Sequence, residues 1–162
     1  MKIAIYPGTF DPITYGHIDV IKKSLNVFDK IIIATTDNIN KNYHFSIEDR
    51  INIINNSLFK DLKFTKNKIK VISFDNLTID LCKKYKANTI IRGLRAVSDF
   101  EYEFQLAGMN KKLNAKIETM FLMSDIENQI ISSKFVKEIA SLGGNIDRFV
   151  TKSTVKVLKN NF

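Results

Sequence analysis

The sequence of 162 residues lacks several features that would point to a secreted, membrane-bound or metal-binding protein. Its single cysteine, Cys82, allows no internal disulfide and no metal site built from several cysteines, and we expect it to lie in the core. No apolar run reaches the roughly 18 residues that a membrane-spanning helix needs. The N-terminus also lacks a signal-peptide cleavage pattern. We therefore expect no membrane association and a cytoplasmic location.

Tryptophan is absent, and there are only four arginines. The hydrophobic content of 44% and the chain length suit one globular domain with a sizeable core. The net charge of +8 fits either a nucleic-acid surface or a site for small polyanions beside a solvated, lysine-rich surface. Because the lysines are scattered and no aromatic residues alternate with the arginines, we favour small anions and expect no nucleic-acid partner.

Strand and helix signals alternate along the chain. The predicted strands are 3–6, 30–35, 69–74, 89–91 and 117–122, and the predicted helices are 18–27, 47–58, 78–85, 98–113, 133–142 and 154–159. Strands that are rich in Ile and Val on both faces, and separated by helices, indicate a parallel sheet covered on both sides. We predict an α/β fold with a doubly wound, parallel five-stranded sheet in one domain, 1–162.

Both prolines, Pro7 and Pro12, lie between the first predicted strand and the first predicted helix. A shaped turn at the carboxyl end of a parallel strand is where ligands bind in open α/β sheets. The free N–H groups and the dipole of the following helix favour a phosphate there. Gly16 would let that phosphate approach the backbone, and His17 would direct a donor at it. The alternative is that His17 caps its own helix.

A second motif, 92–95, reads Arg-Gly-Leu-Arg and follows a buried strand. Arginine combines a planar fork of donors with a permanent charge, which suits phosphate. Arg92 and Arg95 would converge on the site of His17. The alternative is that either arginine pairs with Asp99 or Glu103 in the next helix.

Other polar residues also allow two interpretations. Ser132 and Ser133 are good N-caps, but a helix N-terminus with two hydroxyls can also hold phosphates. Thr78 is likewise a good N-cap. Lys41 by its spacing alone is a solvated lysine. Asp11 either stabilises its turn or contacts a metal.

The three motifs, in this order over nearly the whole chain, resemble those of the bacterial phosphopantetheine adenylyltransferases of the nucleotidyltransferase superfamily. The matching segments are Gly8-Thr9-Phe10-Asp11-Pro12 with Thr14-Tyr15-Gly16-His17, then Arg92 to Glu103, then Ile131-Ser132-Ser133 with Val136-Lys137-Glu138. The resemblance implies a Rossmann-like domain that transfers the adenylyl group of ATP to 4′-phosphopantetheine, giving dephospho-coenzyme A and pyrophosphate. It also implies Mg²⁺ bound with ATP, a homohexamer and feedback inhibition by coenzyme A.

The resemblance makes His17 the catalytic residue, which together with Thr9 would stabilise the α-phosphate in the transition state. The ATP-binding residues it implies are Thr9, Phe10, His17, Gly93, Leu94, Arg95, Glu103, Asn128, Gln129, Ile130, Ile131, Ser132, Ser133 and Lys134. The residues it implies for the acceptor substrate are Thr9, Lys41, Leu77, Thr78 and Arg92, and no metal ligand is assigned. The chain departs from the family at Lys134, where a small hydroxyl residue is usual, and near Asn128, where an aromatic residue is absent.

Two other functions remain open. A related transferase would use another acceptor, such as nicotinamide mononucleotide or glycerol phosphate, but the stretch 92–103 argues against it. A basic nucleic-acid-binding domain that has lost catalysis would keep the fold, but His17, Lys41 and Arg95 argue against that. The tail, 145–162, indicates no function, although Leu158 and Phe162 can pack back on the domain.

Overall fold

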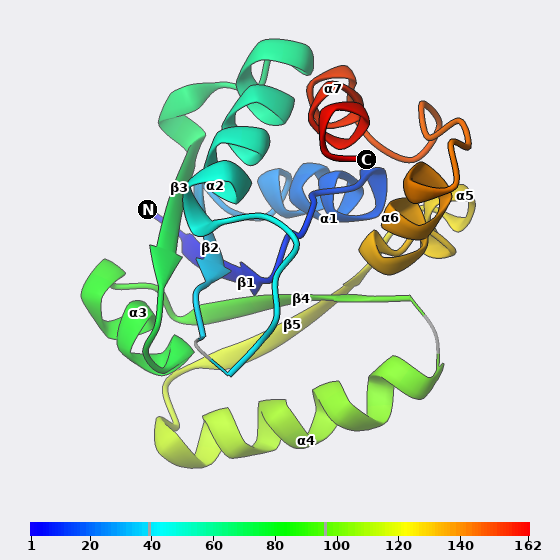
Figure 1. Cartoon of the computed structure of the whole chain (residues 1–162). Helices are drawn as coiled ribbons and strands as arrows, with labels where there is room; N and C mark the ends of the chain where they lie inside the picture. Colours follow the sequence, from blue (N-terminus) through cyan, green and yellow to red (C-terminus); the bar gives the residue numbers. More distant parts are fainter. Residues whose placement is uncertain (39, 96) are drawn as a thin grey trace.

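The computed structural model describes residues 1–38, 40–95 and 97–162. Its centre is a sheet of five parallel strands in the order β3-β2-β1-β4-β5 (Figure 1). The strands are β1 (Ile3–Gly8), β2 (Lys30–Thr36), β3 (Ile69–Phe74), β4 (Thr89–Leu94) and β5 (Glu118–Met123). The predicted parallel five-stranded α/β fold is therefore confirmed, with every predicted strand present.

The helices differ from the predicted ones mainly at their ends. They are α1 (Tyr15–Leu25), α2 (Ile47–Asn55), α3 (Thr78–Tyr85), α4 (Val97–Leu113), α5 (Ile126–Gln129), α6 (Ser133–Ser141) and α7 (Lys152–Asn161). Helix α1 begins before residue 18 because Thr14 and His17 cap its first turn. The helix predicted over 47–58 changes at Asn56 into a π-helical segment, η1 (Asn56–Asp61), and α5 was not predicted.

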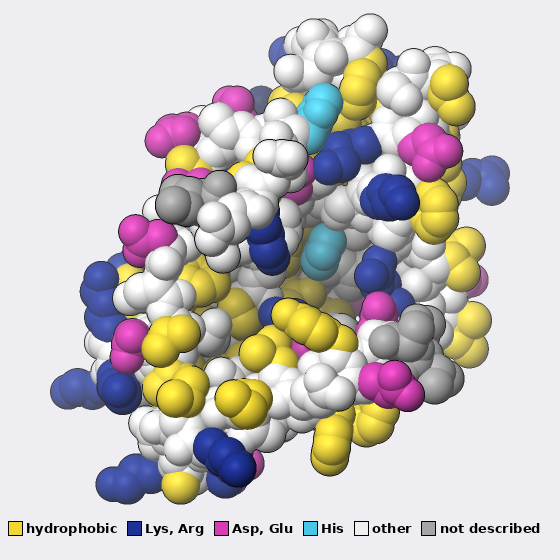
Figure 2. All heavy atoms as spheres, turned by 60° about the horizontal axis from the view of Figure 1, so that its bottom comes forward, with side chains coloured by type: hydrophobic (Ala, Val, Ile, Leu, Met, Phe, Trp, Pro, Cys, Tyr) yellow, Lys and Arg dark blue, Asp and Glu magenta, His cyan; other side chains and the backbone are white. Residues whose placement is uncertain are grey.

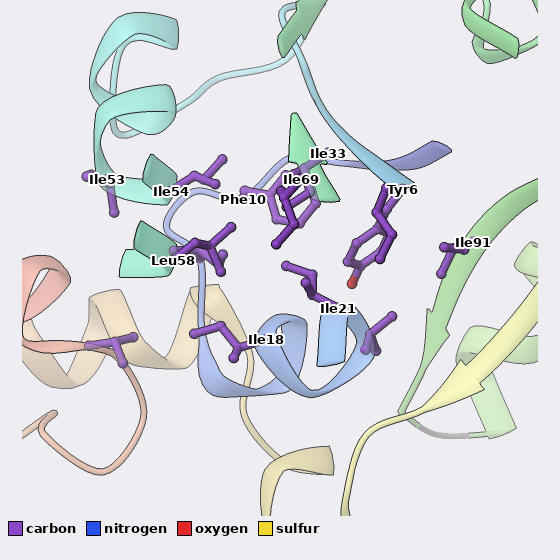
Figure 3. Close-up of a cluster of buried hydrophobic side chains, with 14 of the residues drawn as sticks. Tyr6, Phe10, Ile18, Ile21, Ile33, Ile53, Ile54, Leu58, Ile69 and Ile91 are labelled. Carbon is purple, nitrogen blue, oxygen red and sulfur yellow. The ribbon is translucent and has the colours of Figure 1, made fainter. Parts of the chain in front are cut away.

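Helices cover both faces of the sheet, as a doubly wound fold requires. Figure 1 shows α3 and α4 on one side of the sheet and α1, α2 and α7 on the other. Side chains alternate between these faces along each strand: Ala4 and Tyr6 of β1 join the larger core, whereas Ile5 joins the smaller one with Cys82. The larger core packs Phe10 and Tyr6 against α1 and α2 (Figure 3). The buried position expected for Cys82 is confirmed.

The strands β1 and β4 separate toward their carboxyl ends. β1 pairs with β2 along all of its length but with β4 through Ala4–Thr89 and Ile5–Ile90. The strand order also reverses between these two strands, and a crevice at such a switch point is where ligands bind in open α/β sheets. Gly93 lines the gap from β4, where a Cβ would lie 3.2 Å from a methyl group of Val20.

The C-terminal helix packs back on the domain, as expected. Leu158 is fully buried, while Phe162 remains half exposed and stacks on the exposed ring of His44, with 4.8 Å between the ring centroids. Asp61 of η1 fixes the start of α7 by accepting hydrogen bonds from the backbone N–H and the hydroxyl of Ser153, at 2.8 and 2.9 Å.

One face of α4 remains uncovered. Phe100 and Phe104, one turn apart on this helix, are exposed, with 64% of Phe104 accessible. The helical spacing of 98–113 predicts one face with Phe100, Phe104 and Ala107, either in the core or at a subunit contact. Because Phe100 and Phe104 are exposed, burial in the core of one chain is wrong. In the described part of the chain, no helix combines the length and the apolar character needed to cross a membrane.

Candidate active site

A cavity of about 470 Å³ opens at the carboxyl ends of β1 and β4. It is bounded by the turn after β1, the first turn of α1, the end of β4 and the N-terminus of α6. The predicted site residues that line this cavity are Thr9, Phe10, His17, Arg92, Gly93, Leu94, Arg95, Glu103, Ile131, Ser132, Ser133 and Lys134. Figure 2 shows a hollow in the surface with one histidine inside it and lysine and arginine side chains around it.

His17 both caps α1 and lines this cavity, so the capping interpretation is confirmed without removing the residue from the site. The backbone N–H of Thr14 donates to Nδ1 of His17 at 3.1 Å, and the Thr14 hydroxyl lies 3.0 Å from the same nitrogen. A nitrogen that accepts from a backbone N–H carries no proton. The neutral ring therefore holds its proton on Nε2, which makes that atom a donor.

The charge state of His17 follows from its surroundings. Burial, and then the positive charges of Arg95 and Arg92, lower the pKa of His17 to about 4. The ring is therefore neutral at physiological pH and offers a hydrogen bond rather than a charge.

The turn before α1 is held in a strained conformation. Phe10 has φ +48°, in the left-handed region that residues with bulky side chains rarely adopt. The ring of Phe10 is buried. The ring lies 5.0 Å from that of His17, edge to face. The space at Gly16 admits a neighbouring backbone, because a Cβ there would stand 3.1 Å from the carbonyl oxygen of Asn128. The glycine thus lets α5 approach the N-terminus of α1.

Arg92 is held rigidly across the gap between the strands. Its Nε donates to Oε2 of Glu103 at 2.7 Å, and its Nη2 donates to Oε1 of the same carboxylate at 2.5 Å. Its Nη1 donates to the carbonyl of Pro7 at 2.8 Å, from β4 to β1. The predicted ion pair with Glu103 is confirmed. Three of the five N–H groups of the guanidinium are engaged, and both oxygens of Glu103 face Arg92 rather than the cavity's centre.

Arg95 is more weakly held than Arg92. Its Nε lies 3.3 Å from Asp99, and its side chain is about half exposed at the cavity. The alternative pairing with Asp99 is therefore also confirmed. Exposed pairs of this kind are worth about 1 kcal/mol or less, so an anionic ligand can displace the carboxylate.

The N-terminus of α6 forms the opposite wall. Ser132 is the N-cap, with its hydroxyl accepting from the N–H of Phe135 at 3.2 Å. Ser133 is not a cap, because its hydroxyl donates to the carbonyl of Pro12 at 2.8 Å and joins α6 to the turn after β1. Lys134 lines the cavity and is exposed. Its ammonium therefore stands beside the positive end of the helix dipole.

Comparison with known proteins decides the family. Residues 5–139 match the model of the cytidylyltransferase-like family. The chain is 68% identical to the phosphopantetheine adenylyltransferase of Pelagibacter ubique over 99% of this chain and 98% of the relative. It is 50% identical to that of Vesicomyosocius okutanii, over 98% of each. The chain belongs to the phosphopantetheine adenylyltransferase family.

Solved structures place this adenylyltransferase in a wider fold group. The nicotinic acid mononucleotide adenylyltransferase of Plasmodium falciparum, complexed with NaAD, superposes with a TM-score of 0.71 at 20% identity, over 99% of this chain and 96% of that one. A bifunctional NMN adenylyltransferase/ADP ribose pyrophosphatase from Francisella tularensis gives 0.75 at 14% identity, over 98% of this chain and 49% of the other. At such low identity the likeness shows the common fold.

Three residues expected to meet the acceptor lie outside the lining of the cavity of this adenylyltransferase. Lys41 is exposed in the loop after β2, and its neighbour Asn42 reaches the cavity instead. Leu77 and Thr78 follow β3 at the start of α3. The N-cap predicted at Thr78 is wrong, because Leu77 occupies that position and its side chain has no atom able to cap.

Three of the predicted ATP ligands, in α5 and directly after it, lie outside the cavity's lining. The side-chain amide of Asn128 donates to Oδ2 of the buried Asp19 at 2.6 Å, and that of Gln129 donates to the carbonyl of Ser124 at 3.1 Å. Ile130 is 80% exposed. Ile131, the next residue, is buried and does line the cavity.

Two charged groups of the site were not chosen from the sequence as ligands. Lys137 lines the cavity and donates from Nζ to Oδ2 of Asp11 at 2.8 Å. Asp11 also accepts from the backbone N–H groups of His44 at 2.8 Å and Phe45 at 3.0 Å. Burial alone would raise the pKa of Asp11, but Lys137 and the two N–H groups outweigh it and leave the pKa lowered. Lys137 follows Ser133 by four residues, a spacing that places both on one helix face.

The site has little to offer a metal ion directly. The carboxylate of Asp11 accepts three hydrogen bonds, and that of Glu103 pairs with Arg92. Within residues 1–38, 40–95 and 97–162, no three His, Cys, Asp or Glu side chains are grouped as metal ligands. The donors facing the cavity are instead N–H groups, hydroxyls and cations, which suit the oxygens of phosphates.

Proposed function

We propose that this adenylyltransferase transfers the adenylyl group of ATP to 4′-phosphopantetheine in coenzyme A biosynthesis, giving dephospho-coenzyme A and pyrophosphate. A phosphate oxygen of the acceptor attacks the α-phosphorus of ATP, and the bond from that phosphorus to the pyrophosphate oxygen breaks. The observation that carries the proposal is the meeting of all three family segments, 9–17, 92–95 and 131–134, in one cavity. Because the substrates supply both nucleophile and leaving group, the protein contributes positioning and charge stabilisation.

His17 acts as a neutral hydrogen-bond donor to the α-phosphate. Its Nε2–H is fixed by the cap that Thr14 makes to Nδ1, so no reorganisation is needed when charge develops in the transition state. Thr9 and Phe10 shape the adjoining turn. Neutrality suits this role, because the ring stays in one protonation state across the physiological range.

The cations divide between leaving group and acceptor. Arg95 and Lys134, with the hydroxyl of Ser132 and the backbone N–H groups of Ser132 and Ser133, hold the β- and γ-phosphates. Gly93, Leu94, Glu103 and residues 128–131 complete the ATP site as neighbours of these groups. Arg92 meets the acceptor phosphate through the two N–H groups that Glu103 and Pro7 leave open.

The acceptor extends outward from Arg92. Lys41, Leu77 and Thr78 follow β2 and β3, whose carboxyl ends lie along the same edge of the sheet as the cavity. We assign these three residues to the pantetheine arm and its phosphate. Mg²⁺ enters with ATP, since it prefers phosphates with few carboxylates and those near the cavity are already engaged.

We further propose self-association into a homohexamer through the uncovered face of α4, because exposed apolar patches of this kind mark interaction sites. Sedimentation velocity of wild type and Phe104→Glu tests this, with a smaller species expected for the variant. Coenzyme A, which contains the product's whole skeleton, would compete for the same cavity and act as a feedback inhibitor. The need of the reaction for ATP supports a cytoplasmic location as part of this proposal.

The test is pyrophosphate release from ATP and Mg²⁺ in the presence of 4′-phosphopantetheine. Nicotinamide mononucleotide and glycerol phosphate serve as matched alternative acceptors. Release with 4′-phosphopantetheine alone supports the proposal, and release with another acceptor alone contradicts it. Absence of release with every acceptor, together with salt-dependent binding of an oligonucleotide, would favour a nucleic-acid-binding domain instead.

A further inference from the structure

One buried carboxylate in the cavity wall has no role in the reaction described above. Asp11 is 4% exposed and belongs to the turn after β1. It is also the point where three segments far apart in the chain meet: this turn, the backbone at His44 and Phe45 before α2, and Lys137 of α6.

The three contacts of Asp11 differ in what they can do. The N–H groups of His44 and Phe45 belong to backbone, so they fix the position of the carboxylate. The third contact is to the ammonium of Lys137, the end of a long flexible side chain that would otherwise sample many rotamers. Lys137 lines the cavity, and one quarter of its side chain is exposed there. The ammonium has three donors, and Asp11 takes one.

We propose that Asp11 is a positioning residue of the adenylyl-transfer site, which holds the ammonium of Lys137 at the cavity wall in contact with the phosphates of ATP. The inference rests on the proposed function. Asp11 itself touches no substrate in this scheme and acts through Lys137. Ser133 supports the arrangement, because its bond to the carbonyl of Pro12 fixes α6 against the residue that follows Asp11.

Two other uses of Asp11 fit the contacts less well. A metal ion at this carboxylate would meet the ammonium of Lys137, which lies 2.8 Å from Oδ2 and would repel a second cation. A general base would need a raised pKa, whereas the pKa of Asp11 is lowered, in spite of burial, by Lys137 and the two N–H groups.

The decisive variant is Asp11→Asn, which keeps the shape of the side chain. Its amide has one acceptor oxygen for three donors, and its NH₂ group repels the ammonium. We expect kcat to fall about 100-fold, the effect of misplacing a group by roughly 1 Å, with the KM of each substrate changed less than about threefold. In a double-mutant cycle, Asp11→Asn combined with Lys137→Met should be no slower than Lys137→Met alone.

Asp61→Asn is the matched control. Asp61 also joins two segments by accepting a backbone N–H, here from Ser153, but it lies outside the cavity. This variant should lower Tm and leave kcat unchanged. If Asp11→Asn melts below the assay temperature, Asp11→Glu replaces it, since it keeps the charge and moves the carboxylate by one methylene.

The outcomes separate the inference from the function on which it rests. If wild type releases no pyrophosphate with 4′-phosphopantetheine, the proposed function fails. If wild type is active, a folded Asp11→Asn with the wild-type kcat overturns the positioning role. Effects of Asp11→Asn and Lys137→Met that multiply also overturn it, because Asp11 would then act independently of Lys137.

Discussion

His17 caps α1 through Nδ1, and in the proposed reaction it donates from Nε2 to the α-phosphate; the substitution His17→Asn separates these two roles. The oxygen of an asparagine amide can take the place of Nδ1 and accept from the N–H of Thr14, but no atom of asparagine reaches the position of Nε2. We expect His17→Asn to keep the helix cap and to lose the donor to the α-phosphate. Removing one donor that stabilises transition-state charge costs about 100- to 1,000-fold in kcat, or roughly 3–4 kcal/mol.

His17→Ala is the companion variant, since it removes both nitrogens. It should lose a similar factor in kcat and also about 1 kcal/mol of stability for the lost cap. For a domain of this size that is a fall in Tm of roughly 2–4 °C, whereas His17→Asn should melt within about 2 °C of wild type.

The assay is pyrophosphate release at saturating ATP and 4′-phosphopantetheine, with Tm measured for both variants. If His17→Asn retains kcat within tenfold of wild type, His17 serves as a cap and the role given to Nε2 is wrong. If His17→Asn has as low a Tm as His17→Ala, the hydrogen bond from the N–H of Thr14 does not account for the stability of the cap.

Four further predictions concern the charges at the cavity. The Hε1 signal of His17, assigned by its loss in His17→Asn, should titrate near pH 4 rather than 6.5, because burial and the charges of Arg95 and Arg92 disfavour imidazolium; a midpoint above 6 would contradict the neutral ring. Since the unfolded chain binds that proton near pH 6.5, wild type should lose stability as the pH falls from 6.5 toward 4 while His17→Asn does not, so urea unfolding should show wild type becoming the less stable of the two. Glu103→Gln should cost about 3 kcal/mol in the free energy of unfolding, because it leaves the partly buried Arg92 without its bidentate partner; a loss under 1 kcal/mol by urea titration would contradict this. Lys134→Ser should raise the inhibition constant of pyrophosphate about fivefold, the effect of roughly 1 kcal/mol from one exposed cation, and an unchanged constant would show that Lys134 faces away.

The parts of the fold that were predicted correctly depend on local patterns. The strand 69–74 and the helix 78–85 were predicted with their observed bounds, because apolar periodicity and flanking polar residues define them. Periodicity does not specify α5, which has four residues. Nor does it specify the change to a π-helix at Asn56, where tertiary contacts decide between two helical forms that share one pattern.

The site divides in the same way. The common location of His17, Arg92 and Ser132 could be predicted from the sequence, because the carboxyl ends of parallel strands lie at one edge of the sheet. The sequence could not reveal that Asn128 is bound by Asp19, or that Asp11 pairs with Lys137. Those partners are more than 100 residues apart, and only the packed fold selects them among many carboxylates and donors.

The cavity between β1 and β4 is basic, but carboxylates in its wall reduce the repulsion among its cations. Beyond Ile5 and Ile90 the two strands no longer pair, and Arg92 replaces the missing ladder by donating to Pro7 from across the gap. Glu103 neutralises Arg92, and Asp11 neutralises Lys137, so two of the four cations lining the cavity are fixed by buried carboxylates. Arg95 and Lys134 are the exposed ones. Arg92 and Lys137 are held in place by their carboxylates and can orient phosphate groups. Arg95 and Lys134 are exposed and can offset the charge of a phosphate. Both properties suit a reaction that must orient an acceptor phosphate and release pyrophosphate.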